Sequence, residues 1–216
     1  MKVLVFDVET TGLPEKYASI RQTWRWPYIV QFSWMVYDTS NNKLISLDDH
    51  IINLPKKIKI DNESIKIHGI TNEKMRAKGE NKRVILEKFM NDVKRATILV
   101  AHNLKFDLSM VSVEQIRLNK RNIKTLIDCR KQKYCTMNEG KIIANLYYFN
   151  RYKEKMMLKP PKLIELHERL FKSVPNNLHN SLIDILVCFR CFGKLYWDVD
   201  ILDVNTKLSK LFKTFC

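Results

Sequence analysis

The chain has 216 residues, of which 45% are hydrophobic and 10% aromatic, so a chain that is disordered throughout is excluded. Its five glycines and six prolines exclude a collagen-like or linker-dominated protein. No apolar run reaches the roughly 18 residues that a membrane span needs, and Asp7 and Glu9 interrupt the apolar start. We therefore expect neither a membrane span nor a signal peptide. The five cysteines lack the spacing of a disulfide framework, which favours an intracellular protein that is not secreted.

Positive charge dominates the composition. The chain carries 38 Lys and Arg against 23 Asp and Glu, a formal net charge of +15. The first fifty residues hold five basic and six acidic side chains, so the whole excess comes from residue 51 onward. A field of this size concentrates polyanions near the surface and favours nucleic acid as a partner. The alternative is a lysine-rich composition that serves only solubility.

The pattern of apolar residues predicts one continuous α/β domain. Compact apolar runs predict strands at 3–8, 29–37, 43–54, 97–101 and 133–137. Helical spacing predicts helices at 61–69, 80–95, 105–120, 162–171 and 178–196, the first of them ended by Gly69. No internal repeat is visible. This alternation of strands and helices indicates an α/β fold with a mixed sheet.

Two further segments fit no single interpretation. Between residues 18 and 28, Trp24, Trp26 and Tyr28 alternate with Arg21 and Arg25. These rings could stack on bases, although a loop anchored by buried aromatic residues fits better. The chain divides at 197 into a domain of residues 1–197 and a basic extension of residues 198–216. That extension is either a closing helix packed on the domain or a trailing segment that docks a partner.

Acidic side chains mark a candidate metal site. Asp7 and Glu9 lie two residues apart on the first predicted strand, so their side chains leave the same face. Such a pair is costly to bury unless a cation lies between the carboxylates, and oxygen ligands suit Mg²⁺ or Mn²⁺. The alternative is an exposed pair at the strand end. Asp107 falls in the first turn of the helix predicted at 105–120, where it could equally serve the helix dipole alone.

His179 and Asp184 complete the candidate set. On a regular helix, five residues turn through about 500°, which leaves the two side chains about 140° apart. They face one site only if His179 precedes the helix, in the loop that follows Pro175, Asn176 and Asn177.

Three segments of the sequence resemble, in order and spacing, the motifs of the DEDDh (DnaQ-like) 3′–5′ exonuclease superfamily. They are FDVETTGL (6–13), VAHNLKFDL (100–108) and HNSLID (179–184). This superfamily includes the proofreading subunit of bacterial DNA polymerase III and TREX-type exonucleases. The IHGIT segment at 67–71 and the helix at 162–171 match as well, and the similarity covers residues 3 to about 195. Asn180 stands where the sister subclass carries a catalytic tyrosine, so the histidine subclass is indicated.

The resemblance implies a ribonuclease H-like fold, with a five-stranded mixed sheet flanked by α-helices. It implies hydrolytic removal of nucleoside monophosphates from 3′ ends, with two Mg²⁺ or Mn²⁺ ions held by Asp7, Glu9, Asp107 and Asp184. Asp7 would bridge the two ions. His179 would take the proton from the attacking water, a role that suits an imidazole because it titrates near neutral pH.

The resemblance also implies contacts to the terminal nucleotide. The residues at those positions are Thr10, Thr11, Gly12, Leu13, His102, Asn103 and Phe106. Leu13 would wedge between the last two bases and Phe106 would stack, whereas for His102 a supporting or packing role fits equally well. Contacts of this kind read the backbone and base faces, so we expect weak sequence preference and a preference for single-stranded or frayed 3′ ends.

DNA is the favoured substrate. The nearest alternative is an RNA-trimming exoribonuclease of the same family, and a more distant one is an inactive nucleic-acid-binding protein. A polymerase, or another replication or repair protein, is a further expected partner. The sequence departs from the family pattern at 15–28, at Cys135, at 138–161 and after 197, which leaves substrate choice and partners open.

Overall fold

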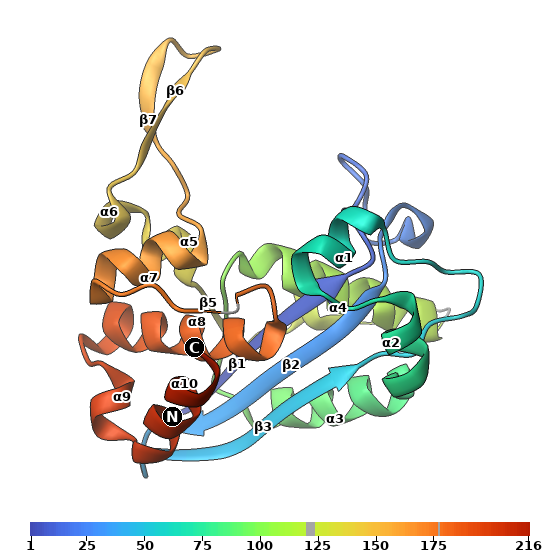
Figure 1. Cartoon of the computed structure of the whole chain (residues 1–216), viewed down its shortest axis with the longest axis horizontal. Coiled ribbons are helices and arrows are strands. Elements are labelled where there is room, and N and C mark those ends of the chain that lie inside the picture. The colour runs from blue at the N-terminus through green and yellow to red at the C-terminus, as the bar shows by residue number, and fades with distance from the viewer. Residues whose placement is uncertain (120–123, 177) are drawn as a thin grey trace.

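The computed structural model describes residues 1–119, 124–176 and 178–216. The strands of its main sheet are β1 (Lys2–Thr10), β2 (Ile29–Asp38), β3 (Lys43–Ile51), β4 (Ile98–Ala101) and β5 (Gln132–Cys135). Within the described residues this sheet has five strands in the order β3-β2-β1-β4-β5 (Figure 1). The first three strands pair antiparallel, while β4 pairs parallel with both β1 and β5. The predicted five-stranded mixed sheet is therefore confirmed.

Helices cover both faces of this sheet. They are α1 (Asn62–His68), α2 (Asn72–Lys78), α3 (Lys82–Arg95), α4 (Leu104–Asn119), α5 (Thr136–Glu139), α6 (Lys141–Ala144), α7 (Leu163–Phe171), α8 (Ser181–Trp197), α9 (Ile201–Val204) and α10 (Thr206–Phe215). Two short 3-10 helices, η1 (Thr23–Arg25) and η2 (Leu126–Asp128), lie in the connections. The core on one face includes residues of α3 and α4, and the core on the other includes residues of α8 and α10.

Strand β1 is buried on both faces, which explains its nearly unbroken apolar sequence. Its even-numbered residues, from Leu4 to Val8, belong to the core that contains α3 and α4. Its odd-numbered residues Val3 and Val5 belong to the core beneath α8. Since side chains alternate along a strand, Asp7 and Glu9 continue the row that faces α8. The alternation of side chains along β1 therefore determines that α8 is the helix that faces Asp7 and Glu9.

Several element boundaries differ from those predicted. Helix α8 begins at Ser181 rather than 178, because the Asn180 side chain accepts the backbone N–H of Leu182 and caps the helix. Gly69 ends α1 in the left-handed conformation, φ +68°, as predicted. Strand β3 ends at Ile51 rather than 54, and α4 begins at Leu104. The predicted helix at 105–120 reaches Lys120 and the predicted loop includes Asn177, both outside the described residues.

The segment before β2 is anchored by one arginine. Arg117 on α4 donates hydrogen bonds to the backbone carbonyls of Thr23 and Trp26, at 2.6 and 2.7 Å. Its guanidinium lies 3.8 Å from the centre of the Tyr28 ring. Trp26 and Tyr28 pack against the core, as the anchored-loop interpretation expects, whereas Trp24 is 76% exposed.

Residues after Trp197 fold back onto the domain. The buried side chains of Ile201 on α9 and Leu208 on α10 join the core beneath α8. Arg190 of α8 and Asp200 form an ion pair of 2.6 Å that ties α9 to the same helix. In this structure, residues 198–216 thus close over the domain. Among the described residues, no helix is long and apolar enough to cross a membrane.

Candidate active site

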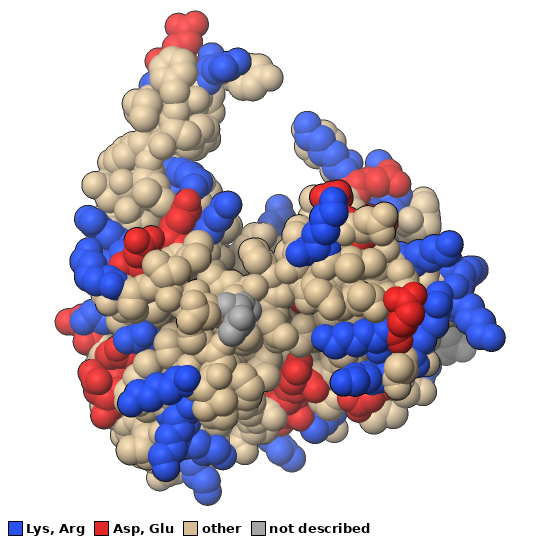
Figure 2. Space-filling model, in the orientation of Figure 1, with Lys and Arg blue, Asp and Glu red and all other residues tan. Residues whose placement is uncertain are grey.

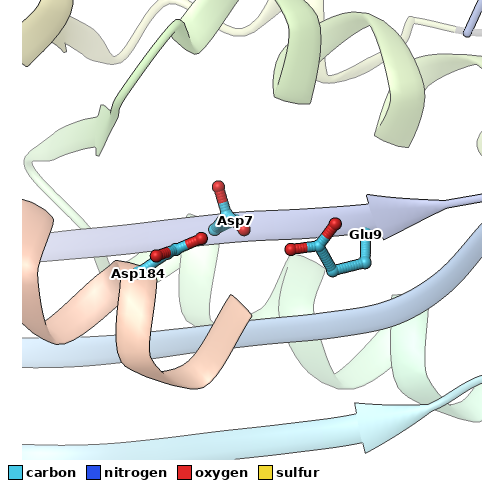
Figure 3. Close-up of side chains that lie close together, drawn as sticks. All are labelled: Asp7, Glu9 and Asp184. Atoms are coloured by element: carbon cyan, nitrogen blue, oxygen red, sulfur yellow. The ribbon is translucent and has the colours of Figure 1, made fainter. Parts of the chain in front are cut away.

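Three carboxylates from two elements meet beside β1. Asp7 and Glu9 leave the same face of β1, and Asp184 comes from the first turn of α8. Each offers a carboxylate oxygen, and the three oxygens lie within 4.8 Å of one another (Figure 3). The structure therefore brings together three of the four acidic residues that the sequence singles out.

Asp107 approaches the same place from the start of α4 and is almost fully buried. The pairing of β1 with β4 covers Val3 to Val5, so the Val8 N–H lies beyond the parallel ladder. The Asp107 carboxylate accepts hydrogen bonds from this N–H and from its own backbone N–H. Asp107 is not part of the trio within 4.8 Å, as far as the described chain shows, but it lies beside it.

Burial and mutual repulsion dominate the electrostatics of this centre. Burial raises the pKa of Asp7 well above its usual range, and the charge of Asp107 is the largest neighbouring contribution to that rise. Burial, with the charges of Asp184 and Asp107, raises the pKa of Glu9 to about 8. Burial raises the pKa of Asp184 to about 7 against a hydrogen bond from the His179 backbone. Among the described residues, no Lys or Arg contributes to the pKa of any of these four carboxyl groups.

The residues present fit a divalent cation. Among the described atoms, Asp184 Oδ1 is buried and has no hydrogen-bond partner, which is costly unless a ligand completes it. Carboxylate oxygens are the hard donors that Mg²⁺ and Mn²⁺ prefer. Asp7, Glu9 and Asp184 could share one cation, and Asp107 is placed to assist.

Polar residues of β2 fix the start of α8 beside these carboxylates. Gln31 lies opposite Glu9 and Ser33 lies opposite Asp7 in the antiparallel ladder. The Ser33 hydroxyl contacts that of Ser181, the first residue of α8. Gln31 accepts the Ser181 backbone N–H at 3.4 Å and donates to Asn180 at 3.2 Å.

Gln31 and Ser33, which position the start of α8, were not predicted from the sequence. The signal for them was two polar residues at alternate positions of an otherwise apolar strand, with Gln31 and Ser33 both buried.

His179 lies just before α8, so it is not on the helix that carries Asp184. Its φ of +71° puts the backbone in the left-handed region, where the chain turns sharply into Asn180. The side chain is exposed, and the backbone is hydrogen-bonded to the Asp184 carboxylate. Of the two arrangements that the sequence allows, the structure therefore has the one in which His179 precedes the helix.

A cavity of about 600 Å³ opens directly from Glu9. Four predicted nucleotide contacts line it, namely Thr10, Gly12, Leu13 and Phe106. Val8, residues 61–64 of the α1 region, Ile67 and His68 form the rest of its lining. A Cβ at Gly12 would lie 2.5 Å from Asp61 Oδ2, so a side chain there would require Asp61 to move. Leu13 is 86% exposed at the mouth of the cavity.

The other three predicted contacts are placed differently. Both ring nitrogens of His102 are 3.0 Å from protein oxygens, Thr136 Oγ1 and the Pro161 carbonyl. Burial lowers the pKa of His102 to about 4, so its ring is neutral and both nitrogens are occupied. This favours the supporting role over a nucleotide contact. The Thr11 hydroxyl accepts the Tyr28 N–H at 3.0 Å, and Asn103 is exposed outside the described cavity lining.

Comparison with known proteins agrees with this geometry. The exonuclease family model RNase_T matches residues 4–192. No curated protein sequence matches the chain.

Among solved structures, Escherichia coli exonuclease I bound to a 5cy-dT13 oligonucleotide superposes with a TM-score of 0.61 and 16% identity. That match covers 99% of this chain and 42% of the other. The zinc-bound E. coli exonuclease I–ssDNA complex gives 0.63 and 17%, covering 94% of this chain and 42% of that one. Exonuclease I from Methylocaldum szegediense gives 0.63 and 13%, with the same coverage.

At these identities the solved structures show the fold alone, and the chain spans less than half their length. The fold is the ribonuclease H-like one that the resemblance implies. Since the family model covers most of the chain, the protein belongs to the exonuclease family, within the DnaQ-like 3′–5′ exonuclease superfamily.

Proposed function

We propose that the chain is a metal-dependent 3′–5′ exonuclease of the histidine (DEDDh) type. It removes nucleoside monophosphates from single-stranded or frayed 3′ ends, with DNA as the favoured substrate. The observation that supports this best is the meeting of the Asp7, Glu9 and Asp184 carboxylates, together with the buried Asp184 Oδ1, which has no hydrogen-bond partner among the described residues. No core requires such a group of acids, and a cation would relieve its repulsion.

Each acidic residue has a distinct task in this proposal. Figure 3 shows Asp7 between Glu9 and Asp184. By the resemblance to the DEDDh superfamily, Asp7 would contribute to both of two cation sites, Glu9 and Asp184 would complete one of them, and Asp107 would serve the other. Two bound divalent cations, Mg²⁺ or Mn²⁺, supply activation of water and neutralise charge on the leaving 3′ oxygen.

His179 is the proposed general base. Its exposed imidazole can exchange protons with solvent, and its backbone is hydrogen-bonded to Asp184, which ties it to the carboxylate centre. Gln31 and Ser33 hydrogen-bond to Asn180 and Ser181 at the start of α8, so the residues that directly follow His179 are held in place. Proton transfer of this kind contributes about 10²–10⁴ to a rate.

The cavity beside Glu9 receives the terminal nucleotide. Thr10, Gly12 and Phe106 line it, and the exposed side chain of Leu13 belongs to the same lining. These groups do not read base edges, which predicts weak sequence preference. Exonuclease I, to which the chain is similar in fold, has been solved with DNA oligonucleotides, and this supports DNA as the substrate.

Digestion of end-labelled oligonucleotides tests the proposal. Matched 3′-labelled and 5′-labelled single strands of DNA and RNA are incubated with Mg²⁺, with Mn²⁺ or with excess chelator, and products are sized on a gel. We expect the 3′ label to be released first as a mononucleotide, on DNA faster than on RNA, and only with a metal. Faster trimming of RNA would instead identify an exoribonuclease, and full digestion in chelator would overturn the metal-dependent reaction.

A polymerase partner stays a prediction, because the comparisons give it no support. Co-purification of the chain with a replication polymerase would be a separate test.

A further inference from the structure

One arm of the molecule carries aromatic and apolar side chains that are exposed and do not belong to the core. It is the antiparallel pair β6 (Tyr147–Asn150) and β7 (Lys155–Leu158), which projects away from the main sheet (Figure 1). Tyr147 and Phe149 lie two apart on one face, with Met156 opposite Phe149, and their exposed fractions are 53%, 58% and 58%. An isolated pair of strands is marginal in water, and contiguous exposed apolar groups usually mark a binding surface.

The arm also carries positive charge. Between residues 147 and 158 there are three basic side chains, Arg151, Lys153 and Lys155, and one acidic side chain, Glu154. Asn150 orders the tip, because its Oδ1 accepts the backbone N–H groups of Tyr152 and Lys153, both at 3.0 Å. Tyr152 is fully exposed there. Rings interleaved with cations match a ligand that offers both flat apolar faces and negative charge.

The base of the arm is tied to the candidate active site. The Lys159 N–H donates to the Leu146 carbonyl at 2.8 Å, which closes the two strands at their root. Lys159 also pairs with Glu165 of α7 at 2.6 Å. Two residues after Lys159, the backbone carbonyl of Pro161 contacts the ring of His102. His102 precedes Asp107 by five residues in the sequence. The arm is therefore rooted in the segment that leads into the carboxylate centre.

A second projection begins on the other side of that centre. Leu13 follows Glu9 by four residues, and the segment 13–25 that it opens exposes Tyr17 and Trp24. Its root is fixed by the paired backbones of Thr11 and Tyr28. Figure 2 shows an open concavity between the two projections, with Lys and Arg on both sides of it.

We propose that the β6–β7 arm and the 13–25 segment are two walls that hold a single-stranded polynucleotide. Tyr147 and Phe149 stack on bases upstream of the 3′ end, and the basic residues of the tip contact the phosphates. The position of the 3′ end rests on the proposed function, while the stacking does not. The ligand is a single strand because paired bases do not offer free faces to stack on.

Binding measured without catalysis tests the arm. The full chain in excess chelator is titrated into 5′-labelled single strands of about 4 and about 20 nucleotides, as DNA and as RNA, with anisotropy as readout. The variant is Tyr147→Val/Phe149→Val, since valine keeps strand propensity and removes both rings. Phe149→Trp keeps a ring at the second position. Val84→Ala, at an exposed site of α3, is the control.

We expect the double variant to bind the long strand about 10-fold or more weakly, because it loses both rings that stack on bases. Its affinity for the short strand should change less than about twofold, and Phe149→Trp and Val84→Ala should match wild type. Unchanged long-strand binding by the double variant, or equal loss at both lengths, would overturn the proposal. A surface for a protein partner would give the first of these results.

The same proteins are then assayed for cleavage with Mg²⁺. Length-dependent binding without any cleavage would contradict the proposed function and leave the arm's role intact. If cleavage is normal and Tyr147→Val/Phe149→Val binds the long strand as tightly as wild type, only the proposed role of the arm is contradicted.

Discussion

The carboxylate centre and the β6–β7 arm differ in what they expose to water and in what destabilises them. The centre brings together one buried and three half-buried acidic groups, Asp107 with Asp7, Glu9 and Asp184, and desolvation and mutual repulsion favour the protonated form of each. The arm does the reverse, because it leaves aromatic rings in water and contributes none of the buried core residues. The carboxylate centre is destabilised by repulsion between its own acidic groups. The arm buries no core side chain, so its folding alone adds little to the stability of the protein.

The two regions therefore favour ligands of different chemistry. Repelling carboxylates are completed by cations, and exposed rings beside lysines are completed by stacked bases and phosphates. The difference implies that the centre is sensitive to metal and pH, whereas the arm is sensitive to strand length and salt. Changes in one region should leave the other's property intact, and this separation can be tested.

The largest effect should come from Asp7→Asn. Asp7 has the most neighbouring acids acting on it, so its loss should remove divalent-ion binding and lower turnover by more than the roughly 10²–10⁴ expected for the base. The metal-free variant should also melt at a higher temperature at neutral pH, because it lacks a carboxyl group whose ionisation is unfavourable in the folded state. Calorimetric Mn²⁺ titration, single-turnover cleavage and thermal melts measure the three effects.

Asp203→Asn, at an exposed position of α9, is the matched control and should change none of them. An Asp7→Asn protein that still binds Mn²⁺ as wild type would remove Asp7 from the metal site.

The next largest effect should come from His179→Ala. Without the base, single-turnover cleavage should slow by about 10²–10⁴, while Mn²⁺ affinity and melting temperature stay unchanged. Raising the pH should partly restore the variant's rate, because hydroxide can replace the missing base. His50→Ala is the control, since His50 lies on β3 with Glu80 at 2.8 Å and should affect stability alone. A folded His179→Ala protein within about threefold of wild type would exclude His179 from the chemistry.

The third expected effect is on stability. The unfolded chain releases carboxyl protons near pH 4, whereas native Glu9 and Asp184 hold theirs to about 8 and about 7. As pH rises from about 5 to 8, the unfolded state loses its protons first, so native stability present at low pH is lost. Metal-free protein should lose roughly 5 °C or more in melting temperature over this range.

Saturating Mg²⁺ should abolish this loss, because the ions bind the ionised carboxylates. Melts by calorimetry in chelator and in Mg²⁺ decide the matter, with Glu9→Gln as the variant in which the slope should flatten. A metal-free melting temperature that climbs with pH would contradict the assigned repulsion.

The sequence predicts the centre well because a buried strand leaves a strong pattern. Apolar runs predict β1, β2 and β4, and the period of two along β1 predicts that Asp7 and Glu9 share one face. Helix α8 was predicted three residues too early, since the capping role of Asn180 depends on its own side-chain geometry. That boundary is what separates His179 from the helix.

The arm was not predicted, and its exposure explains why. Tyr147–Asn150 and Lys155–Leu158 lie in water on both faces, so no face is selected to be apolar and no alternation marks the strands. The seven-residue helix α2 was not predicted. Hydrophobic periodicity in a sequence arises from burial, so an exposed surface leaves only a weak pattern.

The smallest expected effect concerns salt, and it separates the arm's charges from its rings. Neutralising Arg151, Lys153 and Lys155 with glutamine should lower the slope of log K against log salt by about 2, at about 0.7 per phosphate contact on a single strand. Lys207, Lys210 and Lys213 are exposed on α10, near the N-terminus in Figure 1, and their replacement removes the same charge as a control. Anisotropy with a strand of about 20 nucleotides, from about 50 to 200 mM salt, measures both slopes. The ring variant Tyr147→Val/Phe149→Val should weaken binding without changing the slope, because stacking releases no counterions. If both triple variants change the slope equally, the charge of the arm acts only through the net field of the protein, and the phosphates have no specific contact with its tip.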